Sequence, residues 1–162
     1  MLKPLQIPGL IFLFASMLFF TGCYSTFEVV SRNYNYDNDI IFTIDKVQEG
    51  NNISTGNGYY YAKNGSKFVF LYISLKNNSD TKKKLDFDNF YLLEPKSHTK
   101  YKVEFAMLET VVNMFGNVNS EIQKNDTKKR KLVFTFPKGE KAEMLSVNDV
   151  IYHISYSGNS GG

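Results

Sequence analysis

Apolar and polar residues alternate along several stretches of the chain, and this alternation predicts β-strands. It is clearest at 67–77 (KFVFLYISLKN), where every second residue is aliphatic. Val69, Leu71, Ile73 and Leu75 should therefore point to one side of the strand and face a hydrophobic core. The opposite side begins with aromatic residues and ends with polar ones, so we expect it to be partly covered.

Shorter runs of the same kind predict further strands, at 40–47, 85–94, 100–105, 131–136 and 150–156. Segments rich in Gly, Asn, Ser and Lys separate them, as turns require. About seven strands at intervals of roughly ten residues are typical of an antiparallel sandwich, and strands do not alternate with helices as a parallel sheet requires. We therefore predict one all-β domain, an antiparallel β-sandwich.

One segment breaks the β pattern. Between 105 and 115, Leu108, Val111, Val112 and Phe115 recur at helical spacing. This spacing is as compatible with a short helix as with a strand.

The first 22 residues have the parts of a secretory signal. Lys3 is their only charged side chain, the segment 10–20 (LIFLFASMLFF) is wholly apolar or small, and Thr21 and Gly22 follow it. A transmembrane helix needs about 20 apolar residues, so this segment is too short to span a bilayer.

The only cysteine of the chain, Cys23, stands directly after this signal in the sequence FTGC. FTGC resembles the lipobox of bacterial lipoproteins, although Phe20 replaces the usual Leu. The resemblance implies cleavage before Cys23 and acyl chains such as palmitate on that residue, which hold a protein firmly on a membrane. The expected location is the extracytoplasmic side of a bacterial envelope. By analogy with enterobacterial sorting, Tyr24 after the cysteine favours the outer membrane where the host has one.

These features divide the chain into four parts. We expect a lipoprotein signal peptide at 1–22, the lipidated N-terminus and a tether at 23–38, the sandwich at 39–156 and a disordered tail at 157–162. Part of the tether, 27–30, could also pair as an edge strand.

Three segments resemble, in order and spacing, a widespread bacterial domain of unknown function with a telokin-like immunoglobulin fold, which lipoproteins often carry. They are GSKFVFLYISLKNNSD, FDNFYLLEPKSHTKYKV and KKRKLVFTFPKGEKAEML. The matching positions are Asn77, Phe90, Leu92, Tyr101, Phe134 and Pro137. A Pro-Gly pair usual before the late strand is replaced here by KND at 124–126. The resemblance implies an immunoglobulin-like sandwich, and its motifs are structural, so it implies no activity.

Residues for catalysis or metal binding do not gather in the sequence. The two histidines, His98 and His153, lie in an expected turn and an expected strand, far from any nucleophile motif. The carboxylates near 80–94 lack the spacing of a calcium loop. We therefore expect no enzyme activity, no cofactor and no metal. The net charge of +3 implies no nucleic-acid partner.

Two features suggest binding surfaces. Tyr59, Tyr60 and Tyr61 follow a Gly-rich loop, and exposed tyrosine is typical of recognition surfaces. Two basic clusters could form one patch for anionic groups, or could only protect loops and edge strands from aggregation. Their members are Lys82, Lys83, Lys84, Lys128, Lys129, Arg130 and Lys131.

The function expected from these features is that of a lipid-anchored, non-enzymatic binding or structural module that recognises a protein or a glycan through its loops and exposed tyrosines. An inhibitor or accessory subunit of an envelope enzyme or secretion complex is the alternative.

Overall fold

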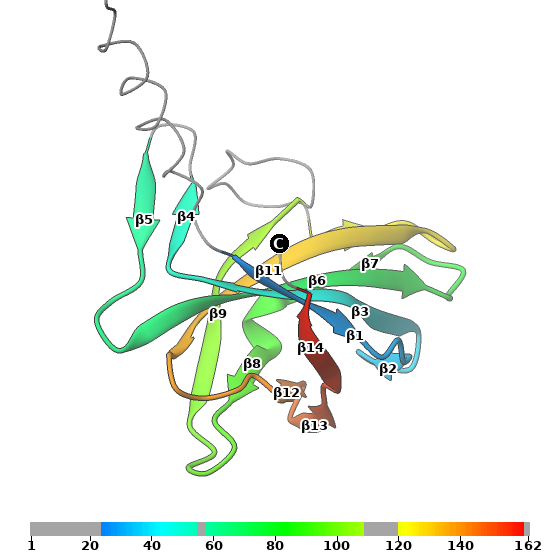
Figure 1. The fold of residues 1–162 in the computed structure, drawn as a ribbon. Helices are drawn as coiled ribbons and strands as arrows, with labels where there is room; N and C mark the ends of the chain where they lie inside the picture. The colour runs from blue at the N-terminus through cyan, green and yellow to red at the C-terminus, as the bar shows by residue number, and fades with distance from the viewer. Residues whose placement is uncertain (1–23, 55–57, 109–119, 161–162) are drawn as a thin grey trace, which may run out of the picture.

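The computed structural model describes residues 24–54, 58–108 and 120–160, which form strands, turns and one 3₁₀ helix (Figure 1). The helix is η2 (Phe87–Asn89). The strands are β1 (Ser25–Val29), β2 (Tyr34–Asn35), β3 (Ile40–Gly50), β4 (Asn52–Ser54), β5 (Tyr59–Tyr61), β6 (Ser66–Asn77), β7 (Lys83–Lys84), β8 (Phe90–Leu93), β9 (Lys100–Met107), β10 (Glu121–Ile122), β11 (Thr127–Pro137), β12 (Met144–Val147), β13 (Val150–His153) and β14 (Tyr156–Ser160).

Ten of these strands form one antiparallel sheet in the order β13-β12-β8-β9-β11-β6-β3-β1-β14, with β2 added beside β3. The sheet folds over at β9, which pairs with β8 on one side and with β11 on the other. The β9–β11 register shifts between Val133 and Phe134, and such an irregularity bends a sheet. As a result β8, β12 and β13 lie beneath β3, β6 and β11 (Figure 1). The prediction of an all-β, antiparallel, immunoglobulin-like sandwich is confirmed, with more short strands than the seven expected.

The hydrophobic core lies between these two layers. The four aliphatic residues of β6 that the alternation assigned to the core are all buried there. Phe42 of β3 connects the layers, because its ring lies 5.8 Å from that of Phe90 and 6.0 Å from that of Tyr152, measured between centroids. The alternation therefore identified the core face of the central strands correctly.

Both ends of the domain are more ordered than the sequence suggested. Within the expected tether, β1 pairs with β3, with Phe27 opposite Val47, as the edge-strand alternative proposed. The expected disordered tail begins at 157, yet β14 pairs with β1, with Ser157 opposite Glu28. Tyr34, also within the expected tether, is buried. Within the tether the edge-strand alternative is the one that the structure shows, and 157–160 form a strand because β1 offers them hydrogen-bond partners.

The segment that could have been a short helix, 105–115, lies mostly outside the described residues. Its first three residues belong to β9 and therefore form strand.

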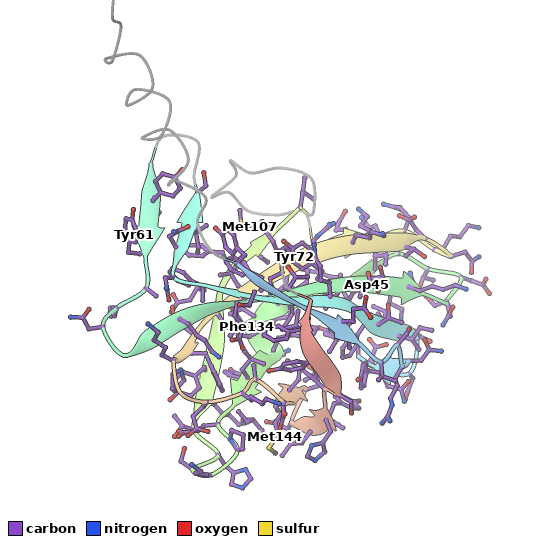
Figure 2. All side chains as sticks on the ribbon, in the orientation of Figure 1. Asp45, Tyr61, Tyr72, Met107, Phe134 and Met144 are labelled. Carbon is purple, nitrogen blue, oxygen red and sulfur yellow. The ribbon has the colours of Figure 1, made fainter. Side chains whose placement is uncertain are left out.

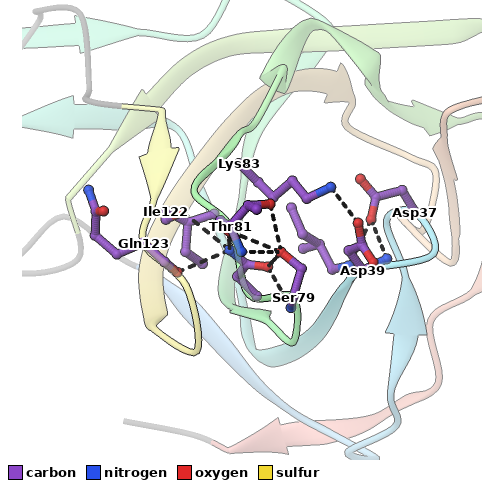
Figure 3. Close-up of polar contacts among 9 residues, drawn as sticks. Asp37, Asp39, Ser79, Thr81, Lys83, Ile122 and Gln123 are labelled. Atoms are coloured by element: carbon purple, nitrogen blue, oxygen red, sulfur yellow. Dashed lines mark hydrogen bonds and ion pairs between the residues drawn. The ribbon is translucent and has the colours of Figure 1, made fainter.

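Asn77, at the end of β6, is fully buried and joins two loops, whose residues Thr81 and Gln123 are labelled in Figure 3. Its Nδ2 donates to the backbone oxygens of Thr81, at 2.7 Å, and Gln123, at 3.0 Å. Its Oδ1 accepts from the backbone N–H and the hydroxyl of Ser79, at 3.0 and 2.8 Å. The side chain thus satisfies backbone groups of the loop after β6 and of the β10–β11 turn at once.

Asn77→Ala should lower the free energy of unfolding by about 2 to 4 kcal/mol, because buried carbonyl oxygens lose their donor. Chemical denaturation monitored by circular dichroism measures the change. Asn78→Ala is the matched control, since Asn78 is exposed and should change stability by less than about 0.5 kcal/mol. Equal stability of both variants would contradict the role given to Asn77.

Candidate functional site

The outer face of the sheet, which points away from the core, carries a row of three residues across its central strands. Lys46 of β3 and Lys131 of β11 both lie opposite Tyr72 of β6. Side chains directly opposite on neighbouring strands share a face. A tyrosine therefore lies between two lysines. Figure 2 shows Tyr72 on the outer side of the sheet and Phe134 in the core beneath it.

A β-bulge in β3 decides which residue joins this row. The register of β3 with β6 shifts at Asp45, so that Lys46 and not Asp45 lies opposite Tyr72. The displaced carboxylate accepts hydrogen bonds from Thr43 Oγ1, at 2.8 Å, and Ser74 Oγ, at 2.5 Å. The bulge thus replaces a negative charge by a positive one beside the tyrosine.

The two lysines lie close to aromatic rings. Lys46 Nζ is 3.8 Å from the centroid of the Tyr72 ring. Lys131 Nζ is 5.9 Å from the centroids of both Phe70 and Tyr72, which is still within reach of a cation–π attraction. Burial lowers the pKa of Lys131, and the positive charge of Lys46 lowers it further. Within the described residues, neither lysine forms an ion pair with a carboxylate.

A chain of hydrogen bonds fixes the tyrosine. Tyr72 Oη donates to Gln48 Oε1 at 2.6 Å, and Gln48 Nε2 donates to Thr26 Oγ1 at 2.8 Å. The amide thus connects the row to β1. A side chain held in this way presents its ring in one orientation.

A pocket of about 190 Å³ opens beside this row. Phe70 and Tyr72 form its aromatic floor, and Lys131 and Gln48 supply a charged and a polar group. The remaining lining residues are Tyr24, Ile53 and Ser54. We call these seven residues the outer-face pocket. Its aromatic surface and few polar groups are typical of a ligand site.

Tyr24, the first described residue, closes one side of the outer-face pocket. Its ring packs edge-on against Phe70, with 5.6 Å between centroids, and its hydroxyl donates to the backbone oxygen of Asn52 at 2.9 Å. The ring also lies against Gly50: a Cβ at that position would come within 2.6 Å of it. Gly50 therefore makes room for Tyr24.

The hairpin formed by β4 and β5 borders the outer-face pocket and presents the three predicted tyrosines. Tyr59, Tyr60 and Tyr61 are 58%, 55% and 70% exposed. Tyr60 lies opposite the pocket residue Ile53 and shares its side of the hairpin. By alternation, Tyr59 and Tyr61 lie on the other side, with 6.3 Å between their ring centroids.

The first of the two basic clusters, 82–84, is largely paired with carboxylates. In the first cluster, Lys82 pairs with Glu121 at 3.0 Å and Lys83 pairs with Asp39 (Figure 3). The hydrogen bond to Asp39 raises the pKa of Lys83. Two of the three charges are therefore already balanced, and only Lys84 has no acidic partner within the described chain.

The second cluster lies on β11 and is divided between the two faces of the sheet. Lys128 and Arg130 point to one face and Lys129 and Lys131 to the other, because side chains alternate along a strand. Arg130 is only 5% exposed. Of the two alternatives left open by the sequence, a single patch that uses all four residues of this cluster is not supported, because consecutive residues of a strand lie on opposite faces.

Several site features had no signal in the sequence. The second face of 67–77 was expected only to be partly covered, and its pattern did not mark Phe70 and Tyr72 as site residues. The bulge that places Lys46, the partner Gln48 and the docking of Tyr24 depend on pairing between distant segments, which a single strand pattern does not contain. Cys23 lies outside the described residues.

Metal and membrane-spanning features are also missing from the described chain. No group of three or more His, Cys, Asp or Glu side chains there is arranged to hold a metal ion. No helix there has the length and hydrophobicity to cross a bilayer.

A second hollow, of about 330 Å³, lies at the seam between β13 and β14. Tyr156 lines it and accepts a hydrogen bond from the backbone N–H of Ala142 at 3.0 Å. Burial raises the pKa of Tyr156, and the carboxylates of Glu49 and Glu143 add to the rise. His153, at the rim, is exposed on an edge strand, as expected from the sequence. This hollow holds no pair of groups suited to proton transfer within hydrogen-bond reach among its described side chains.

Comparison with known proteins gives a family and a fold. A family model described as a domain of unknown function (DUF4352) matches residues 35–156. A conserved hypothetical protein from Bacillus anthracis is similar in structure, with a TM-score of 0.59 and 14% sequence identity over 82% of this chain and 97% of that chain. An uncharacterized β-sandwich protein from Clostridium difficile 630 has a TM-score of 0.52 and 16% identity over 81% and 87%. These likenesses show the fold alone. No curated protein matches the chain.

Lys131→Met should raise the free energy of unfolding by roughly 0.5 to 1 kcal/mol. Methionine keeps the apolar contact with Phe70 but removes a charge that is partly buried and repelled by Lys46. Thermal denaturation measures the shift. Lys76→Met, at an exposed position of the neighbouring strand β6, should leave stability unchanged. A loss of stability in Lys131→Met would show that the charge has a structural role.

Tyr156 should make the protein less stable above about pH 10. The raised pKa means that the folded state keeps the phenol neutral, whereas the unfolded chain loses the proton. Stability is therefore fully present below about pH 10 and falls as the pH rises, by at most about 1.4 kcal/mol per pH unit from this group. Denaturation across this range should show a shallower decline for Tyr156→Phe. An unchanged decline would contradict the assignment.

Proposed function

The chain belongs to the DUF4352 family of domains of unknown function, and we propose that it is a lipid-anchored, non-enzymatic binding module on the extracytoplasmic side of a bacterial envelope. The observation that carries the binding role is the row formed by Lys46, Tyr72 and Lys131 at the outer-face pocket. It holds two positive charges that no carboxylate of the described residues balances.

The chemistry of the pocket suits a ligand with an acid group next to an apolar surface. Phe70 and Tyr72 offer ring faces for stacking, Gln48 offers an amide, and Lys131 offers a charge whose pKa would rise if an anion came beside it. An acidic sugar has these properties, because the C–H face of its ring is apolar and its edge carries hydroxyls and a carboxylate. We therefore propose that the module binds an acidic glycan.

The size of the pocket supports recognition of one sugar unit at a time. Its volume of about 190 Å³ lies below the roughly 300 to 1,000 Å³ typical of sites that enclose a whole small molecule. A polymer would therefore place one unit in the pocket and extend along the outer face. Tyr60, on the pocket side of the hairpin, lies where a neighbouring unit would pass.

The lining of the pocket supports binding without catalysis. It contains no histidine and no carboxylate, and Lys131 is its only group able to carry a positive charge. Acid–base catalysis of glycan cleavage normally uses a pair of carboxylates. The pocket therefore offers contacts to a sugar but no groups to break its bonds.

The anchor is supported by the FTGC motif and by the position of the following residue. Tyr24 is docked on the sheet, so that the domain begins one residue after the proposed lipidated cysteine. A domain held in this way remains at the membrane that carries the lipid.

Oligogalacturonate should bind the mature protein, and its methyl ester, which differs by loss of the negative charge, should bind at least about tenfold more weakly. Isothermal titration calorimetry measures both affinities. Lys131→Gln and Tyr72→Leu should each reduce affinity by a similar factor, whereas Lys128→Gln, on the opposite face of β11, should have no effect.

Two outcomes would overturn this assignment. Equal affinity for the acid and the ester would show that charge does not matter, and wild-type affinity in Lys131→Gln would show that binding occurs elsewhere. Binding of polyglutamate in place of oligogalacturonate would indicate an acidic protein as the ligand.

A further inference from the structure

The side of the β4–β5 hairpin that faces away from the outer-face pocket carries an exposed aromatic surface. Tyr59 and Tyr61 lie there, and both are more than half exposed. The hairpin pairs only with itself as a sheet and projects from the ends of β3 and β6, away from β12 and β13 (Figure 1). These two rings thus contribute little to the core of the domain.

The N-terminal end of the described chain reaches this side of the hairpin from the outer-face pocket, because Tyr24 both lines the pocket and contacts Asn52. Tyr24 Oη is 3.1 Å from the side-chain oxygen of Asn52, and Asn52 lies opposite Tyr61 in the register of the hairpin. Tyr59 is near enough to help raise the pKa of Tyr24, after the larger effect of burial. Tyr24, Tyr59 and Tyr61 therefore form one group, which we call the tyrosine cluster.

The residue before Tyr24 is the proposed lipid-bearing Cys23. Neighbouring Cα atoms are about 3.8 Å apart. A single peptide unit therefore joins the proposed lipid-bearing residue to Tyr24, which belongs to the tyrosine cluster. A lipid on Cys23 would therefore bring the tyrosine cluster to the membrane surface.

The composition of the hairpin suits a lipid surface. From 50 to 66 the chain contains no Asp or Glu, and its only charged residue is Lys63. Tyrosine is enriched at membrane interfaces, where its ring enters the apolar side and its hydroxyl stays among the headgroups. A segment without carboxylates also avoids repulsion by anionic lipids, and a lysine is attracted to them.

We propose that the tyrosine cluster lies in the headgroup layer of the membrane that holds the lipid on Cys23, and so fixes the orientation of the domain. This inference rests on the proposed lipid anchor. The acyl chains supply most of the attachment, and the tyrosines prevent the domain from turning about a single point. With Tyr59 and Tyr61 toward the membrane, Tyr60 points away from it on the opposite side of the hairpin, and β13 lies on the distant side.

The experiment uses the absence of tryptophan from the chain. Tyr61→Trp and Ile151→Trp each introduce a single tryptophan at an exposed position, one in the cluster and one on β13. The lipidated protein is reconstituted in vesicles of phosphatidylethanolamine and phosphatidylglycerol with brominated acyl chains, which quench tryptophan fluorescence at short range. Tyr61→Trp should be quenched at least about twofold and shifted to shorter emission wavelengths, and Ile151→Trp should remain as in water.

A second variant tests the contact that places the cluster. Gly50→Ala puts a methyl group where the Tyr24 ring lies, so it should release Tyr24 and reduce the quenching of Tyr61→Trp. Gly139→Ala is the control, because a Cβ at that position meets no atom within 4 Å. Retained quenching with Gly50→Ala would show that Tyr24 does not position the hairpin.

The two proposals fail in different ways. Flotation of the vesicles in a density gradient tests the anchor separately. If the protein does not float with the vesicles, the proposed lipid anchor is wrong, and so is the membrane role of the tyrosines that depends on it. If it floats, but Tyr61→Trp and Ile151→Trp are quenched equally or not at all, the anchor stands and the orientation is wrong. If the protein floats but neither tryptophan is quenched, the exposed tyrosines would be available to bind a protein partner.

Discussion

The pairing of β6 with a neighbour on each side is the constraint on which the rest of the structure depends. Its register with β11 is continuous from Ser66 to Lys76, and β3 pairs with it over almost the same length. Side chains of a strand alternate between faces, so this one pairing assigns Val69 to the core and Phe70 and Tyr72 to the outer face. A shift of one residue would exchange the two faces. Asn77 ends the strand and fixes the loops that follow it.

The outer face is the place where the structure departs from what stability alone would favour. Lys46 and Lys131 share one tyrosine, and the positive charge of Lys46 makes the ammonium form of Lys131 less favourable. A threonine or valine in place of Lys131 would suit a half-covered strand better. The bulge at Asp45 increases the imbalance, because it removes the nearest carboxylate from the row. Local departures of this kind occur mainly at functional sites, which is the physical reason for placing ligand binding here.

The sequence was sufficient to predict the parts of the fold that depend on a regular period. The alternation in the central strands identified the core residues and the fold class, since hydrophobic burial decides both. It could not predict that β1 and β14 would pair, because this pairing joins two segments that lie far apart in the sequence. The same limit applies to the site. The sequence shows three consecutive aromatic residues at Tyr59, Tyr60 and Tyr61. It does not show that a bulge places Lys46 beside Tyr72, or that strand alternation buries Arg130.

The docking of Tyr24 changes what a lipid anchor would mean for this domain. A free tether over 23–38 would reach up to roughly 55 Å, far enough for the domain to sample ligands well above the membrane. With β1 in the sheet and Tyr24 on Phe70, the free length falls to about one residue. Under the proposed anchoring, the outer-face pocket would meet only groups near the bilayer, and in a nearly constant orientation. A short, fixed connection raises the effective concentration of such groups at the pocket, so that a shallow pocket with few contacts can still be occupied.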